Sequence, residues 1–134
     1  MKIRLLLGYQ LLTGLSDTAT GLMLIFAPAL TLHLMGLQVA GLALPFLSYV
    51  GVFVLSVGIA CFYGAFLVGK PDSAPRLETV WLLTAITRGL VTIFVFSAIT
   101  TGTLEREWIS VALTDGAFAL LQFIGLLRGW LRDV

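Results

Sequence analysis

The sequence predicts an all-α integral membrane protein, a four-helix bundle with antiparallel neighbours and short loops. Hydrophobic residues make up 59% of the 134 residues and charged residues only 11%, against about 25% charged residues in soluble domains. Apolar runs at about residues 5–27, 44–69, 77–101 and 108–130 are each near the length of about 20 residues that a membrane-crossing helix needs. They lack the alternation of membrane β-strands, so we expect helices. One transmembrane domain over residues 1–134 follows.

The first expected span follows two basic residues, as the apolar run of a secretory signal does. Its apolar run is longer than that of a signal and contains an acidic residue, so we expect it to be retained. The segment of residues 29–37 is too short to cross a bilayer. Pro28 favours a helix start, and we expect a short helix there on the membrane surface.

The second and third expected spans are separated by a turn with two prolines, which end one helix and start the next. The second span has small residues at a seven-residue interval, Gly51, Gly58 and Ala65. Small residues let two helix backbones approach closely in a membrane, so this interval predicts a packing seam for a neighbouring helix.

Tryptophans and glycines mark the third and fourth expected spans. Trp108 and Trp130 bracket the fourth span, and Trp81 lies near the start of the third. Tryptophan is enriched at membrane surfaces, so we expect all three to be interfacial anchors. Gly125 and Gly129 are spaced like a helix-dimer motif and are a candidate contact between two copies of the chain.

The basic residues predict the orientation. Six of them lie in the N-terminal segment, the middle loop and the C-terminal segment, which an even number of crossings places on one side. They are Lys2, Arg4, Lys70, Arg76, Arg128 and Arg132. Only Arg106 falls on the other side, so we expect both termini in the cytoplasm and a multi-pass protein of the plasma (inner) membrane. The basic residues are scattered, which argues against nucleic acid as a partner.

Three charged residues lie inside the spans: Asp17, Arg88 and Asp115. Each costs about 2.5 to 3.5 kcal/mol at the centre of a spanning helix. At ~1.5 Å per residue they lie roughly 20, 17 and 20 Å from the cytoplasmic ends of their helices, which puts them in one layer. A guanidinium can bond two carboxylates, so we expect Arg88 to bridge the two acids. The remaining negative charge would need a proton or a cationic ligand.

Polar residues share the helix faces of these charges at steps of three or four residues. This polar lining comprises Gln10, Thr13, Thr84, Thr92 and Gln122. In lipid, such a face turns inward and forms hydrogen bonds between helices. The cluster of Asp17, Arg88 and Asp115 is therefore either a structural clasp or a ligand site, in which Asp17 and Asp115 are the candidate catalytic acids or bases.

The chain offers little for metal or cofactor chemistry. His33, the single histidine, is the candidate axial ligand for a haem or chlorin, but no second such ligand is evident in the sequence. Zinc-protease, paired-cysteine, nucleophile-elbow and phosphate-loop motifs are absent from the sequence, so we expect no cofactor and no metal. A single cysteine, Cys61, excludes an intrachain disulfide.

Several residues spread along the chain carry a likeness to a known family. They are Arg4, Gly21, Phe26-Ala-Pro28, Met35-Gly-Leu37, Tyr49-Val-Gly51, Gly58, Thr87-Arg88 and Asp115. Through them the chain resembles the small four-helix bacterial membrane proteins grouped as DoxX-like, and more closely their uncharacterised relatives of this size. Some members are associated with respiratory or thiol-redox complexes, so the resemblance implies an accessory-subunit role. The single cysteine argues against thiol chemistry here.

Three functions remain open. The first is a non-enzymatic accessory subunit or assembly factor of a larger membrane complex, because nearly the whole chain is span. The second is a binding protein or enzyme for an apolar small molecule, a quinone, isoprenoid or sterol-like lipid, held at the charged cluster. The third is a proton or ion transporter, which requires a homo-oligomer because one copy is too small to enclose a pore. The lipid bilayer is a partner in all three.

Overall fold

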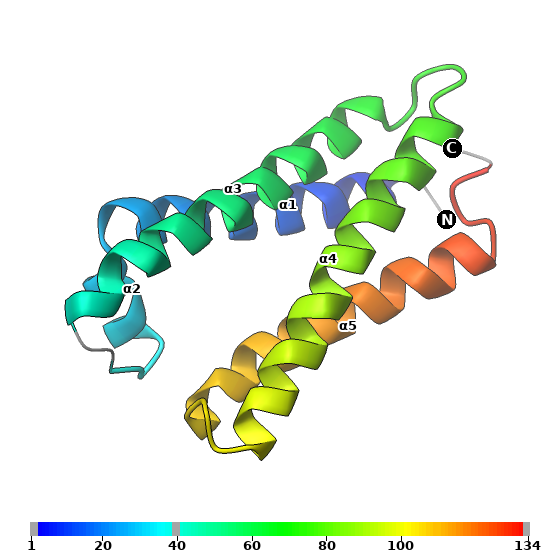
Figure 1. Ribbon diagram of the computed structural model, residues 1–134. Helices are drawn as coiled ribbons and strands as arrows, with labels where there is room; N and C mark the ends of the chain where they lie inside the picture. Colours follow the sequence, from blue (N-terminus) through cyan, green and yellow to red (C-terminus); the bar gives the residue numbers. More distant parts are fainter. Residues whose placement is uncertain (1–2, 39–40, 133–134) are drawn as a thin grey trace. The chain divides into compact units, whose positions relative to one another are not determined.

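The computed structural model describes residues 3–38 and 41–132, and all regular elements in these ranges are helical (Figure 1). The prediction of an all-α fold is therefore confirmed. In chain order the elements are α1 (Ile3–Phe26), α2 (Pro28–Leu34), the 3-10 helix η1 (Gly41–Ala43), α3 (Leu44–Leu67), α4 (Ala74–Thr100), the 3-10 helix η2 (Arg106–Trp108) and α5 (Ile109–Leu127).

Three segments of the described chain are long and apolar enough to cross a membrane: Gly41–Leu67, Ala74–Thr100 and Arg106–Leu127. They contain α3, α4 and α5, so the prediction of membrane-spanning helices is confirmed at this level. The predicted first span is also a helix, and α1 is as long as α3, with 24 residues in each. It does not reach the same apolarity, because Gln10, Asp17 and several hydroxyl residues interrupt its run.

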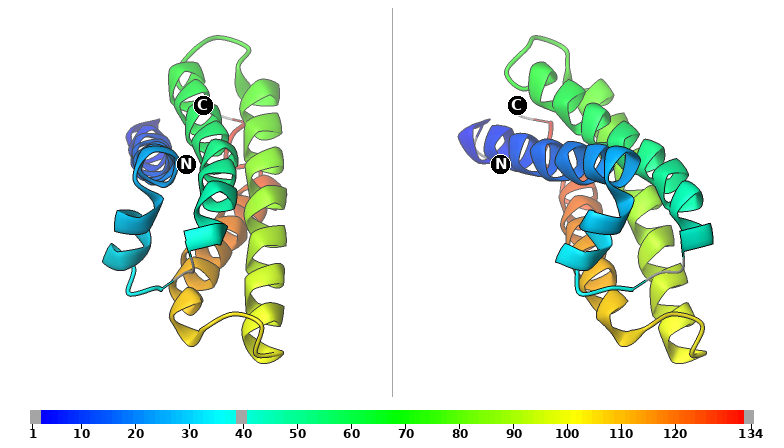
Figure 2. Two further views of the ribbon diagram at one scale, coloured as in Figure 1. Left: turned by 60° about the vertical axis from the view of Figure 1, so that its left-hand side comes forward. Right: turned by 90° about the vertical axis from the view of Figure 1, so that its left-hand side faces the viewer.

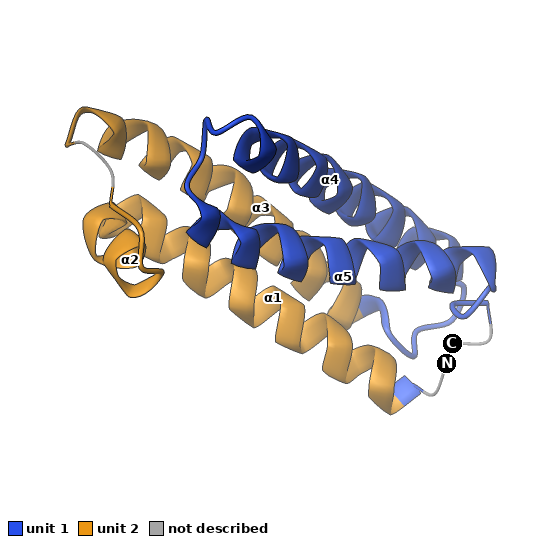
Figure 3. Ribbon diagram, turned by 90° about the horizontal axis from the view of Figure 1, so that it is seen from below, with its two compact units in different colours: residues 1–3, 67–134 blue, residues 4–66 orange. Residues whose placement is uncertain are grey.

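The chain divides into two compact units (Figure 3). Unit 2 covers Arg4–Phe66 and contains most of α1, all of α2 and nearly all of α3, while unit 1 covers Leu67–Val134 with Met1–Ile3 and contains α4 and α5. Each unit is described below by itself. The single domain and the four-helix bundle stay predictions.

In unit 2, α1 and α3 pack at glycines. A Cβ atom built on Gly21 would lie 2.5 Å from the backbone nitrogen of Leu55, and one built on Gly51 would lie 2.9 Å from the carbonyl oxygen of Gly21. Gly58 likewise lies against the backbone of Thr18. The two backbones therefore touch where a side chain would separate them, which is how helices associate in lipid. The predicted seam is confirmed at Gly51 and Gly58.

Unit 2 also contains the predicted short helix, α2, which has seven residues and begins with Pro28. It ends because Gly36 adopts a φ of 74°, a left-handed conformation that suits glycine. The amide of Leu37 then donates to the carbonyl of Leu32 at 2.8 Å and closes the last turn. The helix itself is confirmed, and its place on the membrane surface stays a prediction.

Unit 1 is a helical hairpin in which α4 and α5 lie side by side, joined through a short loop and η2 (Figure 2). Two helix ends of this unit lie three residues from the approximate span bounds that the sequence predicts. α4 begins at Ala74 rather than residue 77, because Pro75 fits the first turn of a helix. α5 ends at Leu127 rather than residue 130, because Gly129 has a φ of 66° and Trp130 donates its amide to Gly125 at 2.9 Å. α3 similarly ends at Leu67, two residues before its predicted end at residue 69.

Candidate functional site: a polar seam between α4 and α5

An ion pair joins α4 and α5 near the middle of the two helices. Arg88 Nη1 on α4 donates to Asp115 Oδ1 on α5 at 2.7 Å. The side chains are 4% and 22% exposed, so the pair is largely removed from solvent. The guanidinium carbon also lies 5.0 Å from the centre of the Phe118 ring, within range of a cation–π interaction. A short, charge-assisted bond and an aromatic face thus hold the Arg88 side chain in one position.

Two further polar contacts flank the pair, one helical turn away on each side. Gln122 Nε2 donates to the Thr84 hydroxyl at 2.7 Å, and that hydroxyl donates to the carbonyl of Val80 at 2.8 Å. Thr92 donates to the carbonyl of Arg88 at 2.8 Å and also approaches the carbonyl of Ala112 on α5 at 3.4 Å. The partners on α5 fall in reverse order, so the two helices of this hairpin run in opposite directions. We call these three contacts the polar seam.

Trp81 and Gly125 close the seam toward the end of α5. Trp81 is fully buried, and a Cβ atom on Gly125 would lie 2.5 Å from Cζ3 of its indole. The prediction of Trp81 as an interfacial anchor is therefore wrong, because the indole fills the space that the glycine leaves. The predicted dimer contact is also wrong in its assignment: Gly125 packs inside its own unit and Gly129 ends the helix.

Three other predicted site residues lie on α1 in unit 2. Gln10 and Thr13 are fully buried and Asp17 is half-buried. The Thr13 hydroxyl donates to the carbonyl of Tyr9 at 2.9 Å, within its own helix. The bond from Arg88 to Asp115 is one arm of the predicted bridge. Because Asp17 belongs to the other unit, the second arm, from Arg88 to Asp17, stays a prediction.

Gln10 has an unusual environment. Its side chain is 0% exposed, yet within the described residues neither Nε2 nor Oε1 has a hydrogen-bond partner. Gln122 Oε1 is in the same position, although its Nε2 is bonded. An unsatisfied buried polar group costs about 1 to 3 kcal/mol, so such groups call for an explanation.

His33 lies on α2, in unit 2, and is exposed. It lines a cavity of about 350 Å³. The other lining residues are Ala29, Leu32, Leu37, Gln38 and Leu44, none of which is a usual haem ligand. In the described part of the chain no group of three or more His, Cys, Asp or Glu residues could hold a metal ion. A cofactor role for His33 stays a prediction.

Sequence reasoning missed two features of unit 1. Phe118 lies three residues after Asp115 and so shares its helix face, and the same stepping that found the polar residues would have found it. The second is a cavity lined by Glu78 and Arg132. Both residues lie outside the layer of the buried charges, where charged side chains are ordinary. No sequence pattern therefore indicates that the two lie close together.

Comparisons with family models, with curated proteins and with solved structures give no match for this chain. The likeness to DoxX-like proteins stays a prediction.

Proposed function

We propose that the chain is a multi-pass protein of the plasma (inner) membrane that forms an antiparallel four-helix bundle and acts as a non-enzymatic accessory subunit or assembly factor of a larger membrane complex. The observation that carries this proposal is the division between the two sides of the α4–α5 hairpin. Polar groups meet one another along the seam, while Ile93, Phe94 and Leu113 are 69%, 67% and 65% exposed. Such an apolar exterior is suited to contact with lipid and with the helices of partner proteins.

The proposal includes α1 as a fourth crossing. At ~1.5 Å per residue, a helix of 24 residues is about 36 Å long, enough for a hydrocarbon core of about 30 Å. Its polar residues lower its average apolarity, but Gln10 and Thr13 are buried, whereas Leu12 and Leu15 are 63% and 64% exposed. The face that lipid would meet is therefore more apolar than the helix as a whole.

Aromatic residues support a crossing by α3. Tyr49 and Tyr63 lie near the two ends of this helix and are 64% and 46% exposed. Tyrosine favours the two membrane surfaces, where its ring meets lipid and its hydroxyl meets water. With α1, α3, α4 and α5 as crossings, six basic residues fall on one side and Arg106 on the other, which supports cytoplasmic termini.

The polar seam supports a structural role rather than an enzymatic one. The charges of Arg88 and Asp115 balance, and the two side chains bond each other directly. Such a pair specifies which residues of the two helices face each other, because a slip by one residue would leave a charge in lipid. In this proposal the pair is a clasp that fixes the register of α4 and α5.

Mild extraction of the tagged chain from its native membrane, followed by native mass spectrometry, tests the accessory role. We expect the chain to co-purify with partner subunits at fixed stoichiometry. A chain that is recovered as a monomer and that carries out its cellular role when reconstituted alone would overturn the proposal.

Cysteine labelling tests the topology. In a Cys61→Ala background, Asp72→Cys places a thiol in the loop between α3 and α4, and Thr103→Cys places one in the loop after α4. A membrane-impermeant thiol reagent should label position 103 in intact cells and position 72 only after lysis. An N-terminal tag should share the side of position 72. A tag found with position 103 would instead indicate three crossings.

Gln10 favours a second candidate function, the binding of an apolar small molecule with one polar head, such as a sterol-like lipid whose hydroxyl both donates and accepts. Both its amide donor and its amide acceptor are buried without a partner among the described residues, and a ligand that both accepts and donates would satisfy them. Native mass spectrometry should then show a small molecule that Gln10→Leu releases. If neither the wild-type chain nor the Gln10→Leu variant carries a small molecule, this candidate function is excluded.

A further inference from the structure

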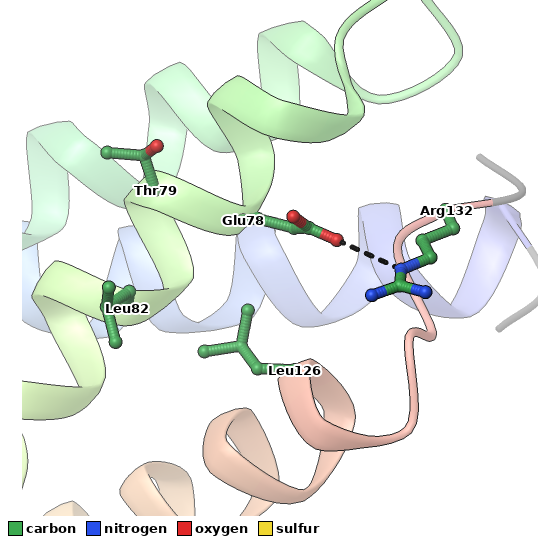
Figure 4. Close-up of a pocket in the computed structure, with 5 residues that line it drawn as sticks. All are labelled: Glu78, Thr79, Leu82, Leu126 and Arg132. Carbon is green, nitrogen blue, oxygen red and sulfur yellow. Dashed lines mark ion pairs between the residues drawn. The ribbon is translucent and has the colours of Figure 1, made fainter.

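A cavity of about 280 Å³ lies at the open end of the α4–α5 hairpin, lined by Glu78, Thr79, Leu82, Leu126 and Arg132 (Figure 4). Glu78 is in the second turn of α4, Leu126 is in the last turn of α5, and Arg132 follows that helix. If these helices cross the membrane as proposed, the cavity lies where hydrocarbon gives way to water.

The cavity has an apolar part and a charged part. Leu82 and Leu126 provide an apolar floor between the helices, and Glu78 and Arg132 stand at the rim with opposite charges (Figure 4). Arg132 Nε lies 3.8 Å from Glu78 Oε1, and the side chains are 78% and 38% exposed. A pair this loose and exposed stabilises little, so both charges can turn to a ligand at small cost.

We propose that this cavity binds a phospholipid whose zwitterionic head carries a primary ammonium, of the phosphatidylethanolamine class. The phosphate would accept from the Arg132 guanidinium, whose planar donors suit phosphate oxygens. The ammonium would donate to the Glu78 carboxylate, and the first part of an acyl chain would lie on Leu82 and Leu126. This inference rests on the proposed crossing of α4 and α5 and goes beyond it in assigning a lipid class.

Complementarity of charge favours this lipid over the other common classes. Phosphatidylglycerol has a phosphate but no cation for Glu78. Phosphatidylcholine has a cation, but its methylated nitrogen has no N–H to donate. A head with both a phosphate and an ammonium uses the two rim charges of the cavity and leaves neither charge without a counterpart.

The test uses the full chain in detergent with an equimolar mixture of phosphatidylethanolamine, phosphatidylcholine and phosphatidylglycerol that have identical acyl chains. Native mass spectrometry measures the fraction of each lipid that stays bound. We expect the first lipid to be preferred by about two- to fivefold, the scale of one exposed charge pair. Glu78→Gln should reduce its preference over phosphatidylglycerol to about onefold, and Arg132→Gln should lower the binding of all three lipids.

Matched controls remove a like charge near the same end of the hairpin without touching the cavity. Asp72→Asn is the control for Glu78→Gln, and Arg128→Gln is the control for Arg132→Gln; both positions are exposed and neither lines the cavity. We expect wild-type lipid preference in both controls. Equal losses in Arg128→Gln and Arg132→Gln would show only a diffuse basic surface and would overturn the inference.

Alkaline extraction of membranes separates this inference from the proposed function. A chain that stays in the membrane and shows no preference among the three lipids overturns the lipid site alone. A chain that alkali strips from the membrane overturns the proposed function, and the lipid site with it. Thermal unfolding of the variants should match wild type, because the exposed pair contributes little to stability.

Discussion

Asp115→Ala removes the carboxylate that accepts from Arg88 Nη1 at 2.7 Å. The guanidinium would then remain in a position where its side chain is 4% exposed, without that counter-charge. Breaking a buried pair by removing one partner costs about 3 to 5 kcal/mol. Because the Asp115 side chain keeps 22% exposure, we expect the lower end, a loss of about 3 kcal/mol in the free energy of unfolding.

The assay is reversible unfolding in mixed micelles of a mild detergent and dodecyl sulfate, in which circular dichroism measures the loss of helix. Thr114→Ala is the matched control, since the hydroxyl of this exposed neighbour donates within its own helix to the carbonyl of Ser110, and the change should shift stability by less than about 0.5 kcal/mol. A double-mutant cycle with Arg88→Met should give a coupling energy of about 1.5 to 3 kcal/mol between positions 88 and 115.

The clasp and the site predict opposite outcomes for Asp115→Ala. A clasp loses stability, and the Arg88→Met change should restore part of it because the buried charge is then gone. A site keeps its stability and loses ligand binding or ion movement. An Asp115→Ala variant within about 0.5 kcal/mol of wild type, with additive effects in the cycle, would refute the reasoning.

Three further predictions concern unit 2 and its sequence-predicted link to Arg88. Gly58→Leu should destabilise by about 3 kcal/mol in the same assay, because the backbone of α1 leaves no room; Gly8→Ala, where nothing lies within 4 Å, should be neutral or stabilise by up to about 1 kcal/mol. Gln10→Leu should raise stability by about 1 kcal/mol if no ligand satisfies its amide, and a fall would contradict this. Asp17→Asn should destabilise wild type by about 1 to 2 kcal/mol and the Arg88→Met variant much less if the predicted bridge exists; equal effects would exclude it.

The positions of the long helices could be predicted from the sequence because membrane thickness sets the length of an apolar run. Their ends were predicted less well, since a cap is a local backbone event. At Gly129 a left-handed residue stops α5, although the apolar pattern continues to Trp130. Hydropathy measures what surrounds a helix and carries no information about where its hydrogen bonds close.

Trp81 shows why burial was harder to predict than position. An indole suits a membrane surface and a tightly packed core equally well, so its place near a helix end favoured the surface. The decisive fact is a glycine on the facing helix, Gly125, whose missing side chain leaves room for the ring. That information is spread over two segments far apart in sequence, and no local pattern contains it.

The pairing of Arg88 with Asp115 could be predicted because a short connection constrains it. The loop after α4 forces α5 back along it, so residues at similar distances from the loop meet, as Thr84 and Gln122 also do. No such rule reaches Asp17, which is connected to α4 only through α2, η1, α3 and their loops. Within the hairpin one cation meets one anion and the charges balance. Whether Arg88 also holds the Asp17 carboxylate is a separate prediction, and the Asp17→Asn change in the wild-type and Arg88→Met backgrounds is the measurement that tests it.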